Sequence, residues 1–312
     1  MQRPPSGRGD RRSPAPTQPA LRFAPSPNGH LHLGHAASAL LNATLAARLN
    51  GCFLLRIEDI DLARCRPVFV DAIVEDLAWL GLAWEEPVRR QSERFPAYRA
   101  AAEPLVAQNL LYPCFCSRTD IARAVAEEEA RTGRTAPRDP DGAPLYPGTC
   151  RGFSPAEARA RLAREPHAWR LDGAGARAAA GPSLAYARFT IDGAEEAVPA
   201  SPERWGDAVI LRKEVPASYH LAVVVDDADQ GITHVVRGAD LEAATDLHVL
   251  LQRLMRLPTP RYHHHPLIRD EAGAKLAKSA GSPSLRSLRE AGIGPDEVWA
   301  RVAAALGVTL LA

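Results

Sequence analysis

Hydrophobic and polar positions along the first ninety residues follow two alternating patterns. Residues 21–25 and 52–59 are short, mostly apolar runs, typical of strands that are buried on both faces of a sheet. Residues 36–50 and 70–82 space their apolar side chains as amphipathic helices do, and Asn50-Gly51 is a helix stop. Strand, loop, helix, strand and helix in this order predict the βαβ arrangement of a parallel sheet, and therefore an α/β fold.

The pattern changes near residue 110 and is restored after residue 202. The intervening stretch is rich in Gly, Pro and Ala, which predicts a loop-rich inserted subdomain. Apolar strands are expected over 221–238, a helix over 241–255, and a strand and turn over 264–279. The predicted organisation is a disordered tail (1–20), two halves of a nucleotide-binding domain (21–109 and 203–262) separated by the insert (110–202), and a C-terminal part with a loop and a short helical end (263–312).

Composition and charge exclude several classes of protein. The 312 residues are 46% hydrophobic and carry a net charge of +1, so a nucleic-acid site would have to be a local patch. No apolar run approaches the roughly 20 residues of a membrane span, and no membrane partner is expected. An odd cysteine count of 5, without a secretory signal, argues against a disulfide framework. We expect a cytoplasmic protein, and a monomer.

The segment "HLHLGH" follows the first predicted strand and opens the first predicted helix. Helix N-termini bind phosphate because their N–H groups are free and carry partial positive charge. His32 and His35 are three residues apart, so both can face one phosphate group, and Gly34 lets a ligand approach the backbone. Two surface histidines in a helix cap are the alternative interpretation of this segment.

Of the 38 Lys and Arg residues in the chain, 35 are arginines and only three are lysines. Two of the three lysines, Lys275 and Lys278, stand three residues apart in "KLAKS". An ammonium group is a compact, mobile charge that can follow a departing pyrophosphate. The pair therefore predicts a triphosphate contact, more directly by Lys278, with chance retention as the alternative.

These motifs together carry a resemblance. H-L-G-H followed by K-L-A-K-S resembles the class I aminoacyl-tRNA synthetases. "RFAPSPNGHLHLGH", "LLRIEDID", "SYHLAVVVDDADQGITHVVRGADL" and "PLI…KLAKS" are similar to the glutamyl-tRNA synthetase group over about residues 21–284. The resemblance implies a Rossmann-type parallel sheet split by an inserted acceptor-type subdomain, ATP bound with Mg²⁺, and L-glutamate as the amino acid. His32, His35, Lys275 and Lys278 are the implied catalytic residues, and His32, Gly34, His35, Asp240 and Lys278 the implied ATP contacts.

The resemblance also implies a glutamate site. Its residues are Arg22, Ala24, Ser26, Glu58, Tyr219 and Arg237. Arginine forks suit the two carboxylates of glutamate, and Glu58 offers a counter-charge for its ammonium group. Val223 stands where the longer synthetases commonly have Asn, and the short glutamyl-Q tRNA(Asp) synthetase family has valine there. Asp240 and Ala277 depart from a common Glu and Ser of the longer enzymes.

The insert carries Cys114, Cys116, Tyr146 and Cys150. Three thiolates and one oxygen suit a closed, structural zinc site, and buried free cysteines are the alternative from spacing alone. The glutamyl-Q family has this arrangement, so the resemblance implies one structural Zn²⁺ per chain. Cys52 and Cys65 are expected to be ordinary residues, and His263, His264 and His265 are interpreted as structural residues that precede a strand.

Only 33 residues follow Ser279, too few for the core of an anticodon-binding domain, and we expect none. The glutamyl-Q family transfers glutamate to the queuosine base at the wobble position of tRNA(Asp), which the resemblance implies here. The alternatives are a truncated glutamyl-tRNA synthetase that charges a tRNA 3′ end, another H-x-G-H nucleotidyltransferase, and a non-catalytic RNA- or partner-binding paralogue.

Overall fold

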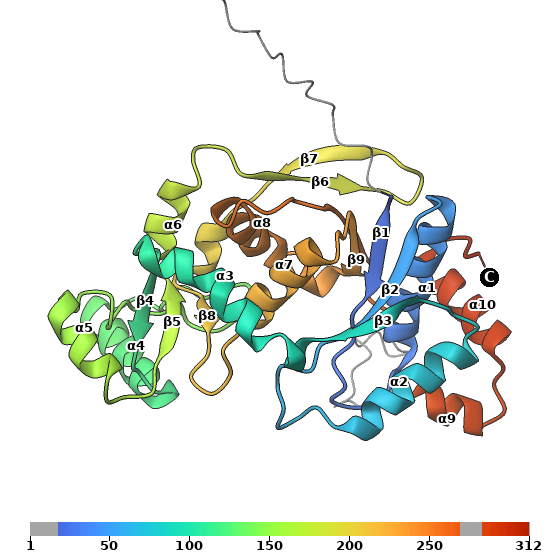
Figure 1. Ribbon diagram of the computed structural model, residues 1–312, viewed down its shortest axis with the longest axis horizontal. Helices are drawn as coiled ribbons and strands as arrows, with labels where there is room; N and C mark the ends of the chain where they lie inside the picture. The colour runs from blue at the N-terminus through green and yellow to red at the C-terminus, as the bar shows by residue number, and fades with distance from the viewer. Residues whose placement is uncertain (1–17, 269–282, 312) are drawn as a thin grey trace, which may run out of the picture.

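The computed structural model describes residues 18–268 and 283–311, which form a mixed α/β molecule (Figure 1). Most of the predicted tail over 1–20 and all of the "KLAKS" segment lie outside these residues. Among the described residues, no helix is both long enough and apolar enough to cross a bilayer.

The first half contains the predicted βαβ arrangement. Strands β1 (Ala20–Phe23), β2 (Cys52–Ile57) and β3 (Glu85–Arg90) pair in parallel in this order, and Ala20 is in register with Cys52. Helices α1 (Leu33–Arg48) and α2 (Pro67–Trp79) connect them, as predicted. The stop signal is confirmed within two residues, and Gly51 is required because an added Cβ would lie 2.3 Å from the Pro19 carbonyl oxygen.

The second half adds a second sheet in the order β7-β6-β10-β9. Strands β9 (His234–Gly238) and β10 (Arg261–His265) are parallel, as are β10 and β6 (Ala185–Phe189), while β7 (Glu195–Pro199) closes an antiparallel hairpin with β6. The Thr233 N–H donates to the Ala20 carbonyl oxygen at 3.0 Å, so β9 begins beside β1 (Figure 1). The parallel sheet β1-β2-β3 and the mixed sheet β7-β6-β10-β9 are therefore joined at this point.

The expectation of strands throughout 221–238 was wrong in its first part, where α7 (Tyr219–Asp229) is a helix. The Ser218 hydroxyl caps its N-terminus by accepting from the Leu221 N–H. Leu221, Val223 and Val224 are all buried, and periodicity cannot distinguish a fully buried helix from a buried strand. The predicted helix over 241–255 is α8 (Ala244–Leu254). The three consecutive histidines lie in β10 instead of preceding a strand.

The insert contains a separate antiparallel sheet, β4-β5-β8, formed by β4 (Leu111–Cys114), β5 (Ala168–Leu171) and β8 (Val209–Leu211). It is more helical than expected, with α4 (Arg118–Thr132), α5 (Pro155–Leu162) and α6 (Gly173–Ala179). Strand pairing crosses the expected boundary near 202, because β6 joins β10 and β8 joins β5. Leu111 and Ile210 also share one buried core with Leu221 and Val235. The sheet of the insert therefore packs into the same hydrophobic core as the second half of the chain.

The remaining helices are α3 (Phe95–Ala107), which leads to β4, and the C-terminal α9 (Leu285–Glu290) and α10 (Pro295–Leu306). The Trp299 indole N–H donates to the Leu80 carbonyl oxygen at 3.0 Å, and buried Val298 and Val302 of α10 join the core of the first half. The short helical C-terminus predicted from the sequence therefore packs against the first half of the chain.

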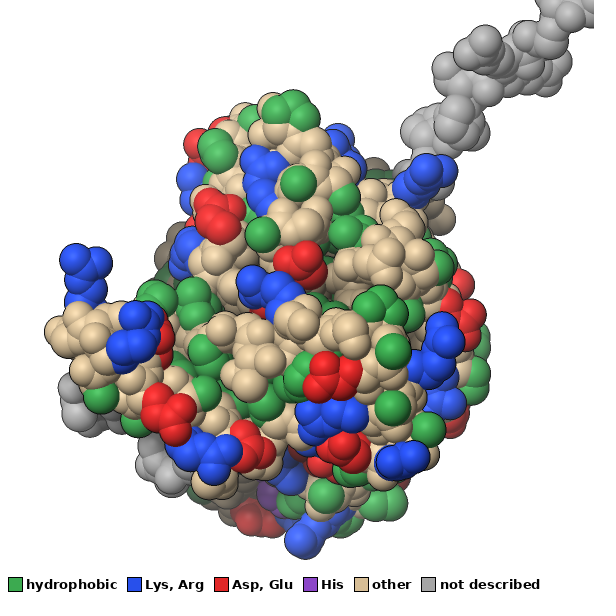
Figure 2. Space-filling view, turned by 90° about the vertical axis from the view of Figure 1, so that its left-hand side faces the viewer, with side chains coloured by type: hydrophobic (Ala, Val, Ile, Leu, Met, Phe, Trp, Pro, Cys, Tyr) green, Lys and Arg blue, Asp and Glu red, His purple; other side chains and the backbone are tan. Residues whose placement is uncertain are grey.

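The face at the insert end carries basic and acidic side chains interspersed with one another (Figure 2). No broad single-sign surface is visible on that face, in keeping with the net charge of +1.

Candidate active site

An open cavity of about 1120 Å³ lies where β1, β2 and β9 end and α1 and α7 begin. This edge of a parallel α/β sheet is the usual place for a ligand. Every described residue that the sequence placed in the ATP and glutamate sites lines this one cavity: Arg22, Ala24, Ser26, His32, Gly34, His35, Glu58, Tyr219, Arg237 and Asp240.

Lys275 and Lys278 lie outside the described residues. The described residues on either side of that stretch lie at the cavity, because Leu267 and Ile268 line it and Ser284 forms a backbone bridge with His32. The Leu285 N–H also donates to the Leu31 carbonyl oxygen at 2.7 Å. The histidine segment thus lies beside the chain that leads out of the lysine segment.

His32 and His35 together form the start of α1. The His32 Nδ1 accepts from the Gly34 N–H at 3.1 Å, and the His35 Nδ1 accepts from the His32 N–H at 3.1 Å. A neutral ring whose Nδ1 accepts must carry its proton on Nε2. Both rings are therefore set in the tautomer whose Nε2–H is a donor, which suits them to the oxygen atoms of a phosphate.

Gly34 has a structural role in this cap. A Cβ at this position would lie 3.0 Å from Cε1 and 3.1 Å from Nδ1 of the His32 ring. Glycine therefore leaves room for the His32 ring to fold back onto the first turn of the helix, and a Cβ here would push the ring aside.

A buried ion network lies behind the cavity. Asp227 of α7 accepts from Arg22 of β1 at 3.0 and 3.3 Å and from Arg56 of β2 at 2.6 Å. Arg56, which is fully buried, also donates to Glu58 at 3.1 Å. Sequence reasoning missed Arg56 and Asp227, although a charged residue inside the apolar run "FLLRI" was a usable signal.

The network shifts the pKa values of its two carboxylates in opposite directions. Burial raises the pKa of Glu58, and the charges of Arg56 and Arg22 only partly offset this effect. For Asp227, burial acts in the same direction, but the two arginines more than compensate and its pKa is lowered. Glu58 thus lies at the cavity with its negative charge incompletely compensated, where an arriving ammonium group would stabilise it.

Arg237 of β9 differs from Arg22 because, within the described part of the chain, it has no carboxylate partner. Its guanidinium is buried and lies against the hydroxyl groups of Thr245 and Tyr219, at 2.8 and 3.4 Å, and against two histidines. A buried cation without a counter-ion is costly, so the cavity it lines is suited to an anionic ligand.

The structure also shows the surroundings of Val223 and Asp240, two positions at which the sequence differs from the longer synthetases. Val223 is buried in α7 and is not among the described residues that line the cavity. Asp240 lines it, and its carboxylate packs over Gly238, where an added Cβ would lie 2.5 Å from Oδ1.

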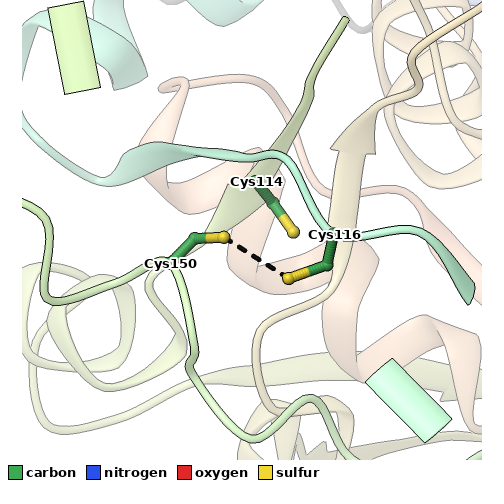
Figure 3. A group of neighbouring side chains, drawn as sticks. All are labelled: Cys114, Cys116 and Cys150. Carbon is green, nitrogen blue, oxygen red and sulfur yellow. Dashed lines mark hydrogen bonds between the residues drawn. The ribbon is translucent and has the colours of Figure 1, made fainter. Parts of the chain in front are cut away.

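A second cluster lies in the insert, at the end of β4. The ligand atoms of Cys114, Cys116 and Cys150 lie within 4.8 Å of one another, and the side chains converge (Figure 3). The Tyr146 hydroxyl lies 3.4 Å from the sulfur atoms of Cys114 and Cys116. Ligand atoms of a tetrahedral metal with bonds of about 2.3 Å are about 3.8 Å apart, so this set fits such an ion.

The electrostatics of this cluster favour a thiolate at one position. Burial would raise the pKa of Cys114, but its hydrogen bonds with Tyr146 and Arg170, together with the charge of Arg170, lower it. The Arg170 guanidinium lies 4.0 Å from the centre of the Tyr146 ring. The cluster could therefore hold a metal ion. Cys52 and Cys65 are half-buried, lie outside the cluster and form no disulfide.

Comparison with known proteins agrees with this geometry. Residues 20–309 match the family described as tRNA synthetases class I (E and Q), catalytic domain. The chain is 45% identical over 288 residues to glutamyl-Q tRNA(Asp) synthetase of Rhodobacter capsulatus, covering 89% of this chain and 97% of that protein. It is 42% identical over 295 residues to the protein of the same name from Symbiobacterium thermophilum, covering 90% and 84%.

Solved structures show the same fold. A glutamate tRNA ligase from Elizabethkingia meningosepticum superposes with a TM-score of 0.69 at 30% identity. The match covers 85% of this chain and 52% of that chain, so this chain corresponds to about half of the longer ligase. With the family match extending over nearly the whole sequence, the chain belongs to the class I tRNA synthetases of the E and Q group.

Proposed function

We propose that this protein uses ATP to activate L-glutamate and then transfers it to the queuosine base at the wobble position of tRNA(Asp). The observation that carries the proposal is the single cavity that gathers Arg237, Glu58 and the His32–His35 cap. The relatives named glutamyl-Q tRNA(Asp) synthetase, matched over most of their length, support the choice of substrate and acceptor.

The amino-acid site uses charges of both signs. Arg237, which lacks a carboxylate partner among the described residues, binds one carboxylate of glutamate through two parallel N–H bonds. Glu58 binds the ammonium group. The charge of Arg22 is already neutralised by Asp227, so Arg22 offers glutamate a directed N–H donor and little net positive charge. Ser26, Tyr219 and Ala24 complete the walls of this site.

In the first step, an oxygen of the glutamate α-carboxylate attacks the α-phosphorus of ATP, and the bond to the β-phosphate bridging oxygen breaks. The products are glutamyl-adenylate and pyrophosphate. The Nε2–H groups of His32 and His35 donate to phosphate oxygens as charge shifts, together with the first N–H groups of α1. Lys275 and Lys278 are assigned to the triphosphate from the sequence alone. A Mg²⁺ ion bound with ATP supplies further charge neutralisation.

In the second step, a ring hydroxyl of queuosine attacks the carbonyl carbon of the adenylate and gives its proton to solvent. The bond from that carbon to the phosphate oxygen breaks, and AMP leaves with the bonding electrons. The mixed anhydride is an activated acyl group, and no side chain of this chain is assigned as the base.

The cysteine cluster is proposed to bind one structural Zn²⁺, through Cys114, Cys116, Cys150 and the oxygen of Tyr146. We also propose the division into the insert (110–202) and the two halves of the nucleotide-binding domain (21–109 and 203–262), although strand pairing crosses the boundary near 202. We also propose that the protein acts in the cytoplasm as a monomer.

Exchange of labelled pyrophosphate into ATP tests the first step. We expect exchange that requires glutamate and proceeds without tRNA, because the acid-binding and phosphate-binding groups share one cavity. Exchange only in the presence of tRNA would instead favour a synthetase that charges a tRNA 3′ end, the second candidate, which the similarity to glutamate tRNA ligases supports.

Transfer of labelled glutamate to two tRNA pools tests the second step. We expect label on tRNA(Asp) from normal cells and none on tRNA from cells that lack queuosine. Equal labelling of both pools would refute queuosine as the acceptor, and label released by removal of the 3′ adenosine would identify the 3′ end. Absence of both exchange and transfer would favour the non-catalytic RNA-binding paralogue.

A further inference from the structure

Arg237 is surrounded by uncharged hydrogen-bond acceptors. Nη2 donates to the Thr245 hydroxyl at 2.8 Å, Nη1 lies 3.2 Å from Nδ1 of His248 and 3.4 Å from the Tyr219 hydroxyl, and Nε lies 3.5 Å from Nε2 of His264. Thr245 and His248 come from α8, one turn apart on the same face, and both are completely buried. These two side chains fix the guanidinium in place without neutralising it.

The protons in this group can be assigned. Because Arg237 can only donate, Nδ1 of His248 must accept, and the proton of this neutral ring is then on Nε2. Nε2 lies 3.2 Å from Nδ1 of His220, to which it donates. The Thr245 hydroxyl accepts from Arg237 and donates its own proton to His264 at 3.0 Å. Each contact therefore has one donor and one acceptor.

The histidines around Arg237 remain uncharged. Burial, followed by the charge of Arg237, lowers the pKa of His248 well below its usual value and that of His264 to about 3. Burial likewise lowers the pKa of His220 to about 4. At neutral pH these rings thus add neither repulsion nor a counter-charge to the guanidinium.

The contacts leave one edge of the guanidinium suited to a ligand. Thr245 uses one of the two N–H groups on Nη2, and the Tyr219 contact on Nη1 is long enough to yield to a better acceptor. Nη1 and Nη2 together form the edge that binds a carboxylate through two bonds.

We propose that His248 and Thr245 are positioning residues that orient this edge of Arg237 and keep its charge uncompensated, so that Arg237 binds a carboxylate of the amino-acid substrate. The inference rests on the proposed function, and it assigns part of the glutamate affinity to two α8 residues that do not line the cavity. Arg22 provides the contrast within the same cavity, because Asp227 already pairs with it.

The test is direct binding of L-glutamate and, separately, of ATP, measured by titration calorimetry. His248→Glu introduces a carboxylate that pairs with Arg237, and we expect glutamate to bind about 100-fold more weakly while ATP affinity changes less than about threefold. His248→Gln retains an uncharged acceptor, and we expect a change below about fivefold. His263→Gln, at a half-buried neighbouring histidine that contacts the Phe189 carbonyl instead, is the matched control and should bind as wild type does.

A second pair of variants covers the case in which His248→Glu does not fold. Thr245→Val removes the Nη2 acceptor at nearly constant volume and should weaken glutamate binding about tenfold, whereas Thr245→Ser should restore it. Equal glutamate affinity of Thr245→Val and Thr245→Ser, or equal loss of ATP and glutamate affinity in His248→Glu, would overturn the inference. A wild-type protein that binds ATP but no glutamate would instead refute the proposed function.

Discussion

Replacing Arg237 by Met should separate substrate binding from stability. The substitution removes the one buried guanidinium at the cavity that has no carboxylate partner among the described residues. Two charge-assisted hydrogen bonds to a substrate carboxylate contribute about 1.5–3 kcal/mol each, and shared geometry makes about 3–5 kcal/mol a reasonable sum. We therefore expect kcat/KM for glutamate to fall about 200- to 4,000-fold.

The same variant should fold nearly as well as wild type. Arg237→Met leaves no carboxylate behind, only neutral acceptors, so its free energy of unfolding should change by about 1–2 kcal/mol at most. Arg56→Met is the comparison variant, because Arg56 holds both Asp227 and Glu58 in the fully buried network. Its loss leaves those carboxylates with fewer partners, and we expect about 3–5 kcal/mol of destabilisation.

Both variants are assayed by pyrophosphate exchange at varied glutamate and by urea unfolding. The reasoning fails if Arg237→Met keeps kcat/KM within about tenfold of wild type. It also fails if Arg237→Met and Arg56→Met lower the free energy of unfolding equally. The presence of a carboxylate partner would then make no difference to what an arginine contributes to stability.

Three further predictions concern other parts of the molecule. Burial raises the pKa of Glu58, and only its carboxylate form binds an ammonium group. As the pH is lowered, KM for glutamate should therefore begin to rise at a higher pH than it would with a Glu of ordinary pKa. Glu58→Gln should bind glutamate weakly, and its KM should not show this pH dependence. Burial raises the pKa of Asp76 to about 6, so its stabilising contribution is full below its ordinary value of 3.8 and is lost as pH rises through about 6. Asp76→Asn should then raise the free energy of unfolding above pH 6, by up to about 3 kcal/mol in urea titrations, and an unchanged midpoint at pH 8 would contradict this. Elemental analysis should find about one zinc per chain, lost in Cys114→Ser and retained in Cys52→Ser, and a stable metal-free wild type would remove the assignment.

Strands β1 and β2 and helices α1 and α2 were predictable because each carries its own local signal, whereas β3 and α3 were not predicted. The apolar runs at β1 and β2, the helical spacing of α1 and the Asn50-Gly51 stop are all readable within short windows. Helix α7 was not, because its run of three valines, of which Val223 and Val224 are buried, favours a strand locally, and the fold rather than the local sequence makes it a helix. The pairing of β6 with β10 could not be predicted from the sequence either, since it joins segments far apart in the chain.

The candidate site divides in the same way. The ATP and glutamate residues that the sequence resemblance proposed do converge on one cavity, apart from the two lysines, which lie outside the described residues. What the sequence could not supply is how those residues are held. Asp227 falls in a segment predicted as a strand, and Thr245 and His248 fall in a predicted helix with no sign of a role, because only the fold brings them to Arg22 and Arg237.

The pairing of Arg22 with Asp227 has a consequence for synthesis on the ribosome. The two side chains are separated by 205 positions, and Arg56 also depends on the same carboxylate. While the first half is emerging, Arg22 lacks its partner Asp227, and Arg56 has only Glu58 of its two carboxylate partners. The amino-acid pocket can therefore mature only after α7 has been translated and released from the exit tunnel, and a nascent chain stalled before that point would display these cations to solvent or to a chaperone.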